Sequence, residues 1–239
     1  ITEVKMGDVE ADAVMRLRTA IATGVPDLPA AEAAGMPIPE KSVPYDREKA
    51  RAWIAAGATP ESRSIRQKIV GNIVHVTFSD FRKNLDRVTA KLNQRLQADT
   101  RGFGVIWDNW PHKSRRWVYS LVKKQLVRAP VWETYYFGWQ NGDPILSYLK
   151  ARDGELPETL VIFDDAAYSG QQITQTVMYL NDHCRRAGLA PPRVIVVLPY
   201  ITQRTIEDLK KLGVGDEDIL WEVRMQTMQE ILEPGEIAA

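Results

Sequence analysis

Two adjacent carboxylates and a Ser-Gly pair lie close together in the second half of the chain. Asp164 and Asp165 directly follow an apolar run at 160–163, and Ser169 and Gly170 come after a short spacer. We expect a helix to begin after Gly170, so the amide groups of its first turn would point at one spot that favours an anion. Carboxylates accept hydrogen bonds from sugar hydroxyls and hold Mg²⁺ directly or through water. The segment therefore predicts a ligand with a phosphate, a diol and a metal-bound polyphosphate.

The predicted phosphate cradle combines the end of the spacer, the Ser-Gly pair and the first helical turn. Its members are Tyr168, Ser169, Gly170, Gln171, Gln172 and Ile173. Gly170 suits this turn, because a residue without a side chain adopts unusual backbone conformations and lets a ligand approach closely. The hydroxyl of Ser169 adds one more donor to the cradle.

A second polar loop, 108–113, follows the predicted buried strand at 103–107. Ligands of open α/β sheets bind beyond the carboxyl ends of the strands, so this loop is expected at the same edge as the acidic pair. His112 is a candidate acid, base or phosphate donor in it. The three histidines do not cluster by spacing, and the single cysteine, Cys184, falls on an apolar helix position. A metal site built on histidine or cysteine is therefore disfavoured.

The elements that must position these residues alternate between strand and helix after residue 70. Strands are predicted where apolar or β-branched residues run together, and helices where apolar residues recur every three or four positions. The predicted strands are 73–78, 103–107, 131–137, 160–163, 194–198 and 219–223, and the predicted helices are 80–97, 114–127, one begun by Asp143-Pro144, one after Gly170 and one opened by Thr202. Strands that are apolar throughout, separated by amphipathic helices, imply a doubly wound, mostly parallel α/β sheet.

The first part of the chain has a different composition. Six of the 14 prolines lie before residue 63, with Ala-rich stretches between them. Each proline removes a backbone donor and restricts the preceding residue, so short helices joined by extended turns are expected, one of them at 8–22. We divide the chain into an N-terminal arm, 1–69, and an α/β domain, 70–239. The arm is interpreted as a structural wrap, with a lid or partner-binding segment as the alternative.

Composition narrows the class of protein. The 239 residues include 31 Lys+Arg and 31 Asp+Glu, so the net charge is zero and a globally basic nucleic-acid binder is disfavoured. The interval 82–128 holds twelve Lys/Arg against three Asp/Glu, which leaves a local patch open. One cysteine excludes an internal disulfide, and no apolar run approaches the ~20 residues of a membrane helix. We predict a cytoplasmic protein without a membrane partner and leave its oligomeric state open.

The segment 160–173 resembles the phosphoribosyl-diphosphate (PRPP) motif of the type I phosphoribosyltransferases: four apolar residues, two acids, a spacer and a Ser/Thr-Gly loop that opens a helix. The order of elements over about 70–225 is similar too. The resemblance implies that Asp164 and Asp165 are catalytic, contact the ribose hydroxyls and hold Mg²⁺ through those hydroxyls or water. It implies that 168–173 wraps the 5′-phosphate, and that the pyrophosphate is faced by Lys113, Ser114 and Arg115.

The activity implied by this resemblance is glycosyl transfer. Phosphoribosyl would pass from PRPP to an unidentified nitrogen acceptor, with release of pyrophosphate and with Mg²⁺ as cofactor. The partner would be a small phosphosugar or nucleotide. His112, Trp139 and Trp221 are the candidates for contact with the acceptor or for its covering loop.

Two departures from the family pattern motivate other hypotheses. Gln171 replaces a small residue in the tightest part of the loop, and Trp110 has no family counterpart. A non-catalytic regulator that senses a phosphosugar or nucleotide is therefore the alternative. A partner-binding module on the same fold, with a basic centre for a protein or nucleic acid, is a third hypothesis.

Overall fold

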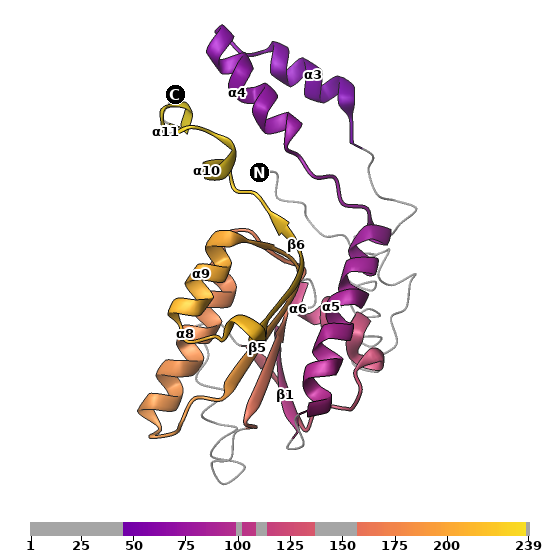
Figure 1. Cartoon of the computed structure of the whole chain (residues 1–239), viewed down its shortest axis with the longest axis vertical. Coiled ribbons are helices and arrows are strands. Elements are labelled where there is room, and N and C mark those ends of the chain that lie inside the picture. The colour runs from indigo at the N-terminus through magenta and orange to yellow at the C-terminus, as the bar shows by residue number, and fades with distance from the viewer. Residues whose placement is uncertain (1–44, 99–101, 109–113, 137–156, 238–239) are drawn as a thin grey trace, which may run out of the picture.

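A parallel sheet lies at the centre of the computed structural model, which describes residues 45–98, 102–108, 114–136 and 157–237 (Figure 1). Its strands are β1 (Phe103–Asp108), β2 (Trp132–Tyr136), β3 (Thr159–Phe163), β4 (Ala166–Ala167), β5 (Arg193–Thr202) and β6 (Ile219–Met225). The order is β2-β1-β3-β5, with β4 and β6 also paired to β5, and every pairing is parallel. The predicted α/β class is confirmed.

Helices cover both faces of this sheet. One face carries α5 (Phe78–Ala98) and α6 (Ser114–Val122), which continues into the short 3₁₀ helix η2 (Lys123–Gln125). The other face carries α8 (Gln171–Arg186) and α9 (Gln203–Lys211), while η3 (Asp216–Asp218) leads into β6. Figure 1 shows the two helix pairs on opposite sides of the strands. This arrangement buries the strands on both faces and explains why they read as continuous apolar runs.

Each face has its own apolar layer. Alternate residues of β3 divide between them: Leu160 and Ile162 pack with α8 and α9, whereas Val161 and Phe163 pack with α5 and α6. All four side chains are fully buried. The division follows from the strand geometry, since successive side chains point to opposite faces.

The strand order places a topological switch at the centre of the sheet. From β1 the chain moves outward to β2 and then returns to β3 on the other side of β1. In open α/β sheets the crevice beyond the carboxyl ends of two such strands is where ligands bind. Here that crevice lies between the start of α6 and the segment that follows β3.

A small group of helices stands above the sheet. It consists of α3 (Arg47–Ala55), α4 (Pro60–Gly71), α10 (Met228–Ile231) and α11 (Pro234–Ile237), and we call it the helical cap (Figure 1). Lys68 of α4 and Glu236 of α11 form an ion pair at 2.6 Å. The described part of the predicted arm is thus helical, and the end of the chain packs beside it.

The predicted strand at 73–78 is wrong. Residues 73–77 form no strand, and Ile73 and Val74 are 51% and 69% exposed. They link α4 to α5 outside the sheet, because β-branched alternation makes a strand only where a neighbouring strand is available to pair. The next helix begins at Phe78, and Thr77 with Asp80 supplies its capping contacts.

The other strand predictions are confirmed, with boundaries shifted by a few residues. The expected helices at 8–22 and after Asp143-Pro144 lie outside the described residues. Among the helices that the structure describes, none combines the length and apolar character needed to span a membrane.

Candidate functional site

The acidic pair interrupts a strand rather than ending it. Phe163 pairs with Val197 of β5, and Ala166 pairs with Tyr200, so β4 continues the register of β3 along the same edge of β5. Asp164 still donates its amide to the Val197 carbonyl at 3.2 Å. Asp164 and Asp165 therefore occupy a two-residue break between β3 and β4, which keep one register on β5 at the carboxyl end of the sheet.

The two acids face different surroundings. Asp164 is 3% exposed, and its carboxylate accepts hydrogen bonds from the Ser114 hydroxyl and from Nε of Arg115, the latter at 3.3 Å. It also accepts the amide of Asp165 at 3.0 Å. Both oxygens of Asp164 thus already have hydrogen-bond partners within the protein, and its expected contact with ribose stays a prediction.

Asp165 is less buried and borders a hollow on the α5/α6 face. Its carboxylate accepts the Ala166 amide at 2.8 Å. Burial, and then the neighbouring charge and hydrogen bond of Asp164, raise its pKa from 3.8 to about 6. A carboxyl group whose pKa is raised and that borders an open hollow is a candidate for contact with a ligand. Asp165, rather than Asp164, is that member of the pair.

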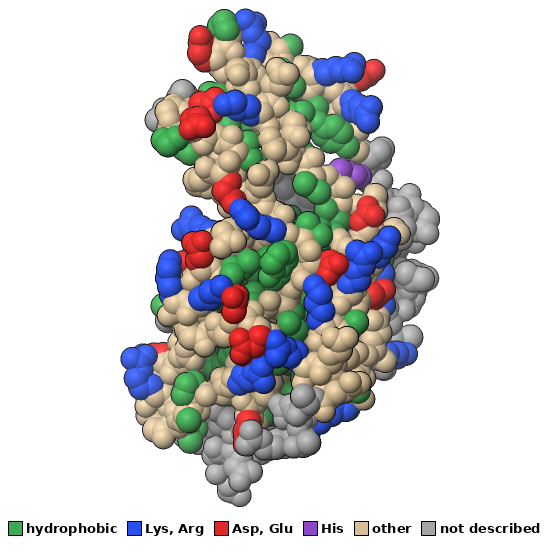
Figure 2. Space-filling model, in the orientation of Figure 1, with side chains coloured by type: hydrophobic (Ala, Val, Ile, Leu, Met, Phe, Trp, Pro, Cys, Tyr) green, Lys and Arg blue, Asp and Glu red, His purple; other side chains and the backbone are tan. Residues whose placement is uncertain are grey.

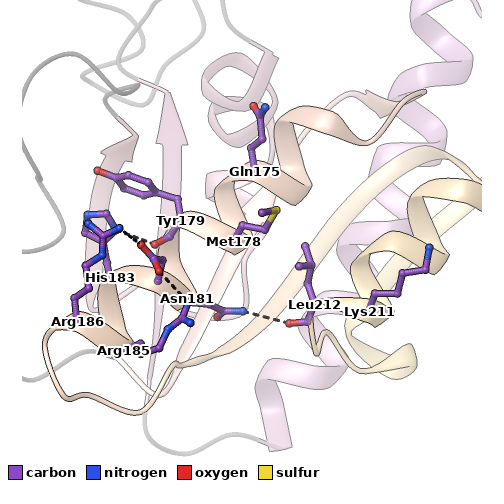
Figure 3. Close-up of a pocket in the computed structure, with 10 residues that line it drawn as sticks. Gln175, Met178, Tyr179, Asn181, His183, Arg185, Arg186, Lys211 and Leu212 are labelled. Carbon is purple, nitrogen blue, oxygen red and sulfur yellow. Dashed lines mark hydrogen bonds and ion pairs between the residues drawn. The ribbon is translucent and has the colours of Figure 1, made fainter.

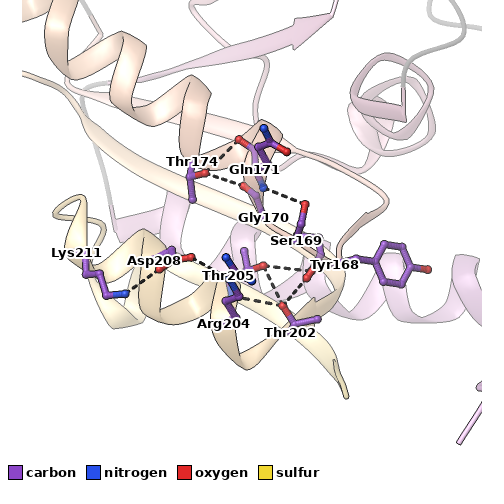
Figure 4. A network of polar contacts seen from close by, with 11 residues as sticks. Tyr168, Ser169, Gly170, Gln171, Thr174, Thr202, Arg204, Thr205, Asp208 and Lys211 are labelled. Carbon is purple, nitrogen blue, oxygen red and sulfur yellow. Dashed lines mark hydrogen bonds and ion pairs between the residues drawn. The ribbon is translucent and has the colours of Figure 1, made fainter. Parts of the chain in front are cut away.

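The turn after β4 matches the predicted cradle in its backbone. Gly170 is the N-cap of α8 and has φ +68°, in the left-handed region that favours glycine. A Cβ at this position would lie 2.6 Å from Oγ1 of Thr205, so α9 packs directly against the turn. Figure 4 shows this packing, with Thr202 and Thr205 on one side of the turn and the side chain of Tyr168 pointing away from it.

Part of the cradle is used by the protein. The Gln171 amide donates to Oγ of Ser169 at 3.4 Å, and the Thr174 amide begins the helical bonding to the Gly170 carbonyl at 2.9 Å. Gln171 and Gln172 are exposed, whereas Ile173 is buried in the α8/α9 layer. Ile173 can thus contribute its amide group to a ligand but not its side chain.

Aromatic side chains line the hollow beside Asp165. This hollow has a volume of about 360 Å³. Phe81 lies at the centre of this group: its ring centroid is 5.2 Å from that of Trp117 and 6.4 Å from that of Tyr200. The Tyr200 hydroxyl accepts a hydrogen bond from the Asn84 amide at 2.9 Å. The hollow has the size and the lining to hold a flat ring.

The sequence does not predict these aromatics as site residues. Phe81 and Trp117 fall on apolar positions of predicted helices, a pattern that indicates only packing against the core. They come from α5, α6 and β5, which are brought together by the fold alone. The one available signal was that both helices carry a large aromatic in the turn nearest the ligand edge of the sheet.

The predicted pyrophosphate and acceptor residues divide in three ways. Ser114 lies at the ligand edge, as expected. Arg115 is 2% exposed and turned inward to Asp164, because α6 carries it on its buried side, so it does not stand open toward a pyrophosphate. Trp221 packs against the α8/α9 layer, on the face opposite the aromatic hollow, which argues against its predicted acceptor contact. His112, Lys113 and Trp139 lie outside the described residues.

The predicted Mg²⁺ has limited support from the protein groups. The described residues contain no cluster of three or more His, Cys, Asp or Glu side chains suited to a metal. Mg²⁺ commonly keeps several waters and binds through one or two carboxylates plus the phosphates of a substrate. Asp165 can supply such a carboxylate, so the residues fit a metal that arrives with a polyphosphate ligand.

A larger hollow of about 740 Å³ lies between α8 and α9 (Figure 3). Its charged groups are engaged with one another: Arg185 and Arg186 both pair with Asp182, at 2.8 and 2.5 Å. Asn181 donates to the Leu212 carbonyl at 3.2 Å. The residues that line this groove do not include the helix start that distinguishes the site at Asp165.

Comparison of the chain with protein-family models, with curated proteins and with solved structures finds no match.

Proposed function

We propose that this protein binds a phosphorylated ribose compound, PRPP or a nucleoside monophosphate, at the carboxyl end of β3. The observation that carries the proposal is the break between β3 and β4 that places Asp165 beside an aromatic hollow, followed within a few residues by the Gly170 turn and the start of α8. The 5′-phosphate would meet the first-turn amides of α8, and the ribose hydroxyls would donate to Asp165.

The activity proposed for this site is phosphoribosyl transfer. The bond from C1 of the ribose to pyrophosphate breaks, and its electron pair leaves with the pyrophosphate. A nitrogen lone pair of the acceptor forms the new C1–N bond, and that nitrogen then loses its proton. Asp165 would stabilise the positive charge that develops on the ribose ring, and the aromatic hollow would orient the acceptor. Mg²⁺, bound with the pyrophosphate, would supply charge neutralisation.

One observation favours the second candidate, a non-catalytic sensor. Arg115 pairs with Asp164 inside the protein, which removes a cation that a leaving pyrophosphate would need. A site with the phosphate cradle and Asp165 but without that cation would hold a phosphoribosyl ligand without promoting its cleavage.

Binding and pyrophosphate release distinguish the two candidates. PRPP with Mg²⁺, at 100 times its dissociation constant, should stabilise the protein by ~2.7 kcal/mol in a thermal shift measurement. Pyrophosphate release in the presence of a panel of nitrogen heterocycles would support the transferase, and binding without release would support the sensor. If PRPP, ribose 5-phosphate and nucleoside monophosphates all leave the melting temperature unchanged, both candidates are rejected.

Substitution of Asp165 tests the site itself. Asp165→Asn removes the charge and keeps the shape, so PRPP turnover should fall by about two orders of magnitude or more, and binding should weaken. Asp216→Asn is the matched control, because Asp216 lies in η3, before the amino end of β6, with its side chain 75% exposed. Equal effects of the two substitutions would contradict the assignment.

A further inference from the structure

Arg115 makes contacts that the site as described does not use. Its Nε donates to Asp164 at 3.3 Å and its Nη1 donates to Oγ1 of Thr176 at 2.8 Å. Arg115, Asp164 and Thr176 are each 3% exposed or less. Arg115 belongs to α6, Asp164 directly follows β3, and Thr176 belongs to α8. One buried guanidinium thus joins three elements that converge at the ligand edge.

The contacts extend to the first turn of α8. Thr176 donates its hydroxyl hydrogen to the Gln172 carbonyl at 2.8 Å and accepts the hydrogen bond from Arg115. On the other side, the hydroxyl of Ser114, at the start of α6, donates to Asp164. A continuous chain of hydrogen bonds, buried at Asp164, Arg115 and Thr176, therefore runs from the start of α6 to the first turn of α8.

The geometry of this chain requires an arginine. Two different nitrogen atoms of the planar guanidinium reach two different acceptors, and a lysine ammonium at the end of a flexible stem cannot reproduce that fork. Arg115, Asp164 and Thr176 are also buried away from water, so each of their donors and acceptors depends on its hydrogen-bond partner. Loss of one contact is expected to loosen the elements on both sides of it.

We infer that Arg115 is a positioning residue, with Asp164 and Thr176 as its partners. Its guanidinium holds the first turn of α8 close to the acidic pair, so that the cradle and Asp165 can contact the same ligand. This inference rests on the proposed function for the identity of the ligand. It assigns Arg115 and Asp164 an indirect role, in place of the direct ligand contacts expected from the sequence.

The test compares hydrogen-bonding and isosteric variants of two residues. Arg115→Lys and Thr176→Val should each weaken ribose 5-phosphate binding, measured calorimetrically without Mg²⁺, by about tenfold. Thr176→Ser keeps the hydroxyl and should bind as the wild type does. Arg185→Lys is the control for the Arg-to-Lys change, because Arg185 is 76% exposed at the far end of α8. In a double-mutant cycle, Arg115→Lys and Thr176→Val together should cost less than the sum of both.

Amide hydrogen exchange of the ligand-free protein separates this inference from the proposed function. The Thr174 amide, bonded to the Gly170 carbonyl, should exchange faster in Arg115→Lys and Thr176→Val and at the wild-type rate in Thr176→Ser. Failure of the wild type to bind ribose 5-phosphate, PRPP and nucleoside monophosphates would reject the proposed function, while the exchange rates still judge the role of Arg115. Wild-type exchange at Thr174 in both variants would overturn the inference, as would a Thr176→Ser variant as impaired as Thr176→Val.

Discussion

Asp164 and Asp165 show how far the environment of two identical neighbours can differ. Asp164 is buried, and its carboxylate accepts hydrogen bonds from Ser114, Arg115 and the Asp165 amide. Asp165 borders a hollow, lacks a cation of its own among the contacts described, and has its pKa raised to about 6 by burial first and by Asp164 second. The pair therefore consists of one structural carboxylate and one that is open to a ligand.

The raised pKa of Asp165 has a consequence for stability. The folded state binds this proton more tightly than the unfolded state does, since the pKa rises from 3.8 to about 6. Above pH 6 the charged carboxylate therefore destabilises the fold, and this effect declines as the pH falls through 6 toward 4. Asp165→Asn should stabilise the protein by about 1–3 kcal/mol at pH 8, and by less at pH 4.5.

Urea unfolding at the two pH values measures this difference. Asp216→Asn is the control for the Asp-to-Asn change, because the Asp216 side chain is 75% exposed. A gain in stability at neutral pH together with a loss of ligand binding would mark Asp165 as a residue kept for function at the expense of stability. An Asp165→Asn variant that is equally destabilised at both pH values would contradict the burial argument.

At the scale of elements, the turn from β4 into α8 determines where the proposed phosphate cradle would lie. After the acidic pair, β4 stays in register on β5, and Gly170 then reverses the chain into α8. Thr205 of α9 packs on Gly170 and donates to the Ala167 carbonyl at 3.3 Å. The turn is thus held by packing against α9 and, through Arg115, by contact with α6.

Gly170→Ala tests this packing, and Gly188 provides a matched control. Both glycines have positive φ, +68° and +70°, but a Cβ at Gly188 would meet open space, whereas one at Gly170 would meet Thr205 at 2.6 Å. Gly188→Ala should cost only the backbone strain, about 1 kcal/mol, and Gly170→Ala should cost about 2 kcal/mol or more in addition. Equal losses in chemical denaturation would show that α9 gives way at the turn.

At the scale of the whole molecule, the sheet and the helical cap differ in how they are held. The strands β3 and β5 carry fully buried side chains in both apolar layers. In α3 and α4 no residue is buried, and the contacts of the helical cap include the exposed ion pair between Lys68 and Glu236. Such ion pairs contribute little, so local stability should differ strongly between the two parts.

Amide hydrogen exchange across the chain measures that difference. The amides of β5 should be the most protected among the described residues, and those of α3 and α4 should exchange through local opening at rates orders of magnitude higher. Lys68→Ala should raise exchange in the helical cap and leave β5 unchanged. Equal protection of the helical cap and β5 would mean that this part of the chain is held by contacts beyond those described here.

Much of the fold follows from local patterns in the sequence. The apolar runs at 160–163 and 194–198 predict the central strands, and Gly170 predicts the start of α8, because periodicity and glycine conformation are local properties. The strand expected at 73–78 failed for the complementary reason: alternation is local, but a strand exists only with a partner to pair with. The function was likewise reached from the sequence only as a hypothesis.

Local patterns in the sequence predict most of the strands and helices and the segment that carries the candidate site. That Asp164 contacts Arg115 while Asp165 borders the aromatic hollow follows from the packing of separate elements. The same packing decides that Phe81, Trp117 and Tyr200, from three separate elements, share that hollow. The physical reason is that side-chain partners and burial depend on contacts between residues far apart in the chain, and no local pattern of residues encodes which of two neighbouring carboxylates will find a cation.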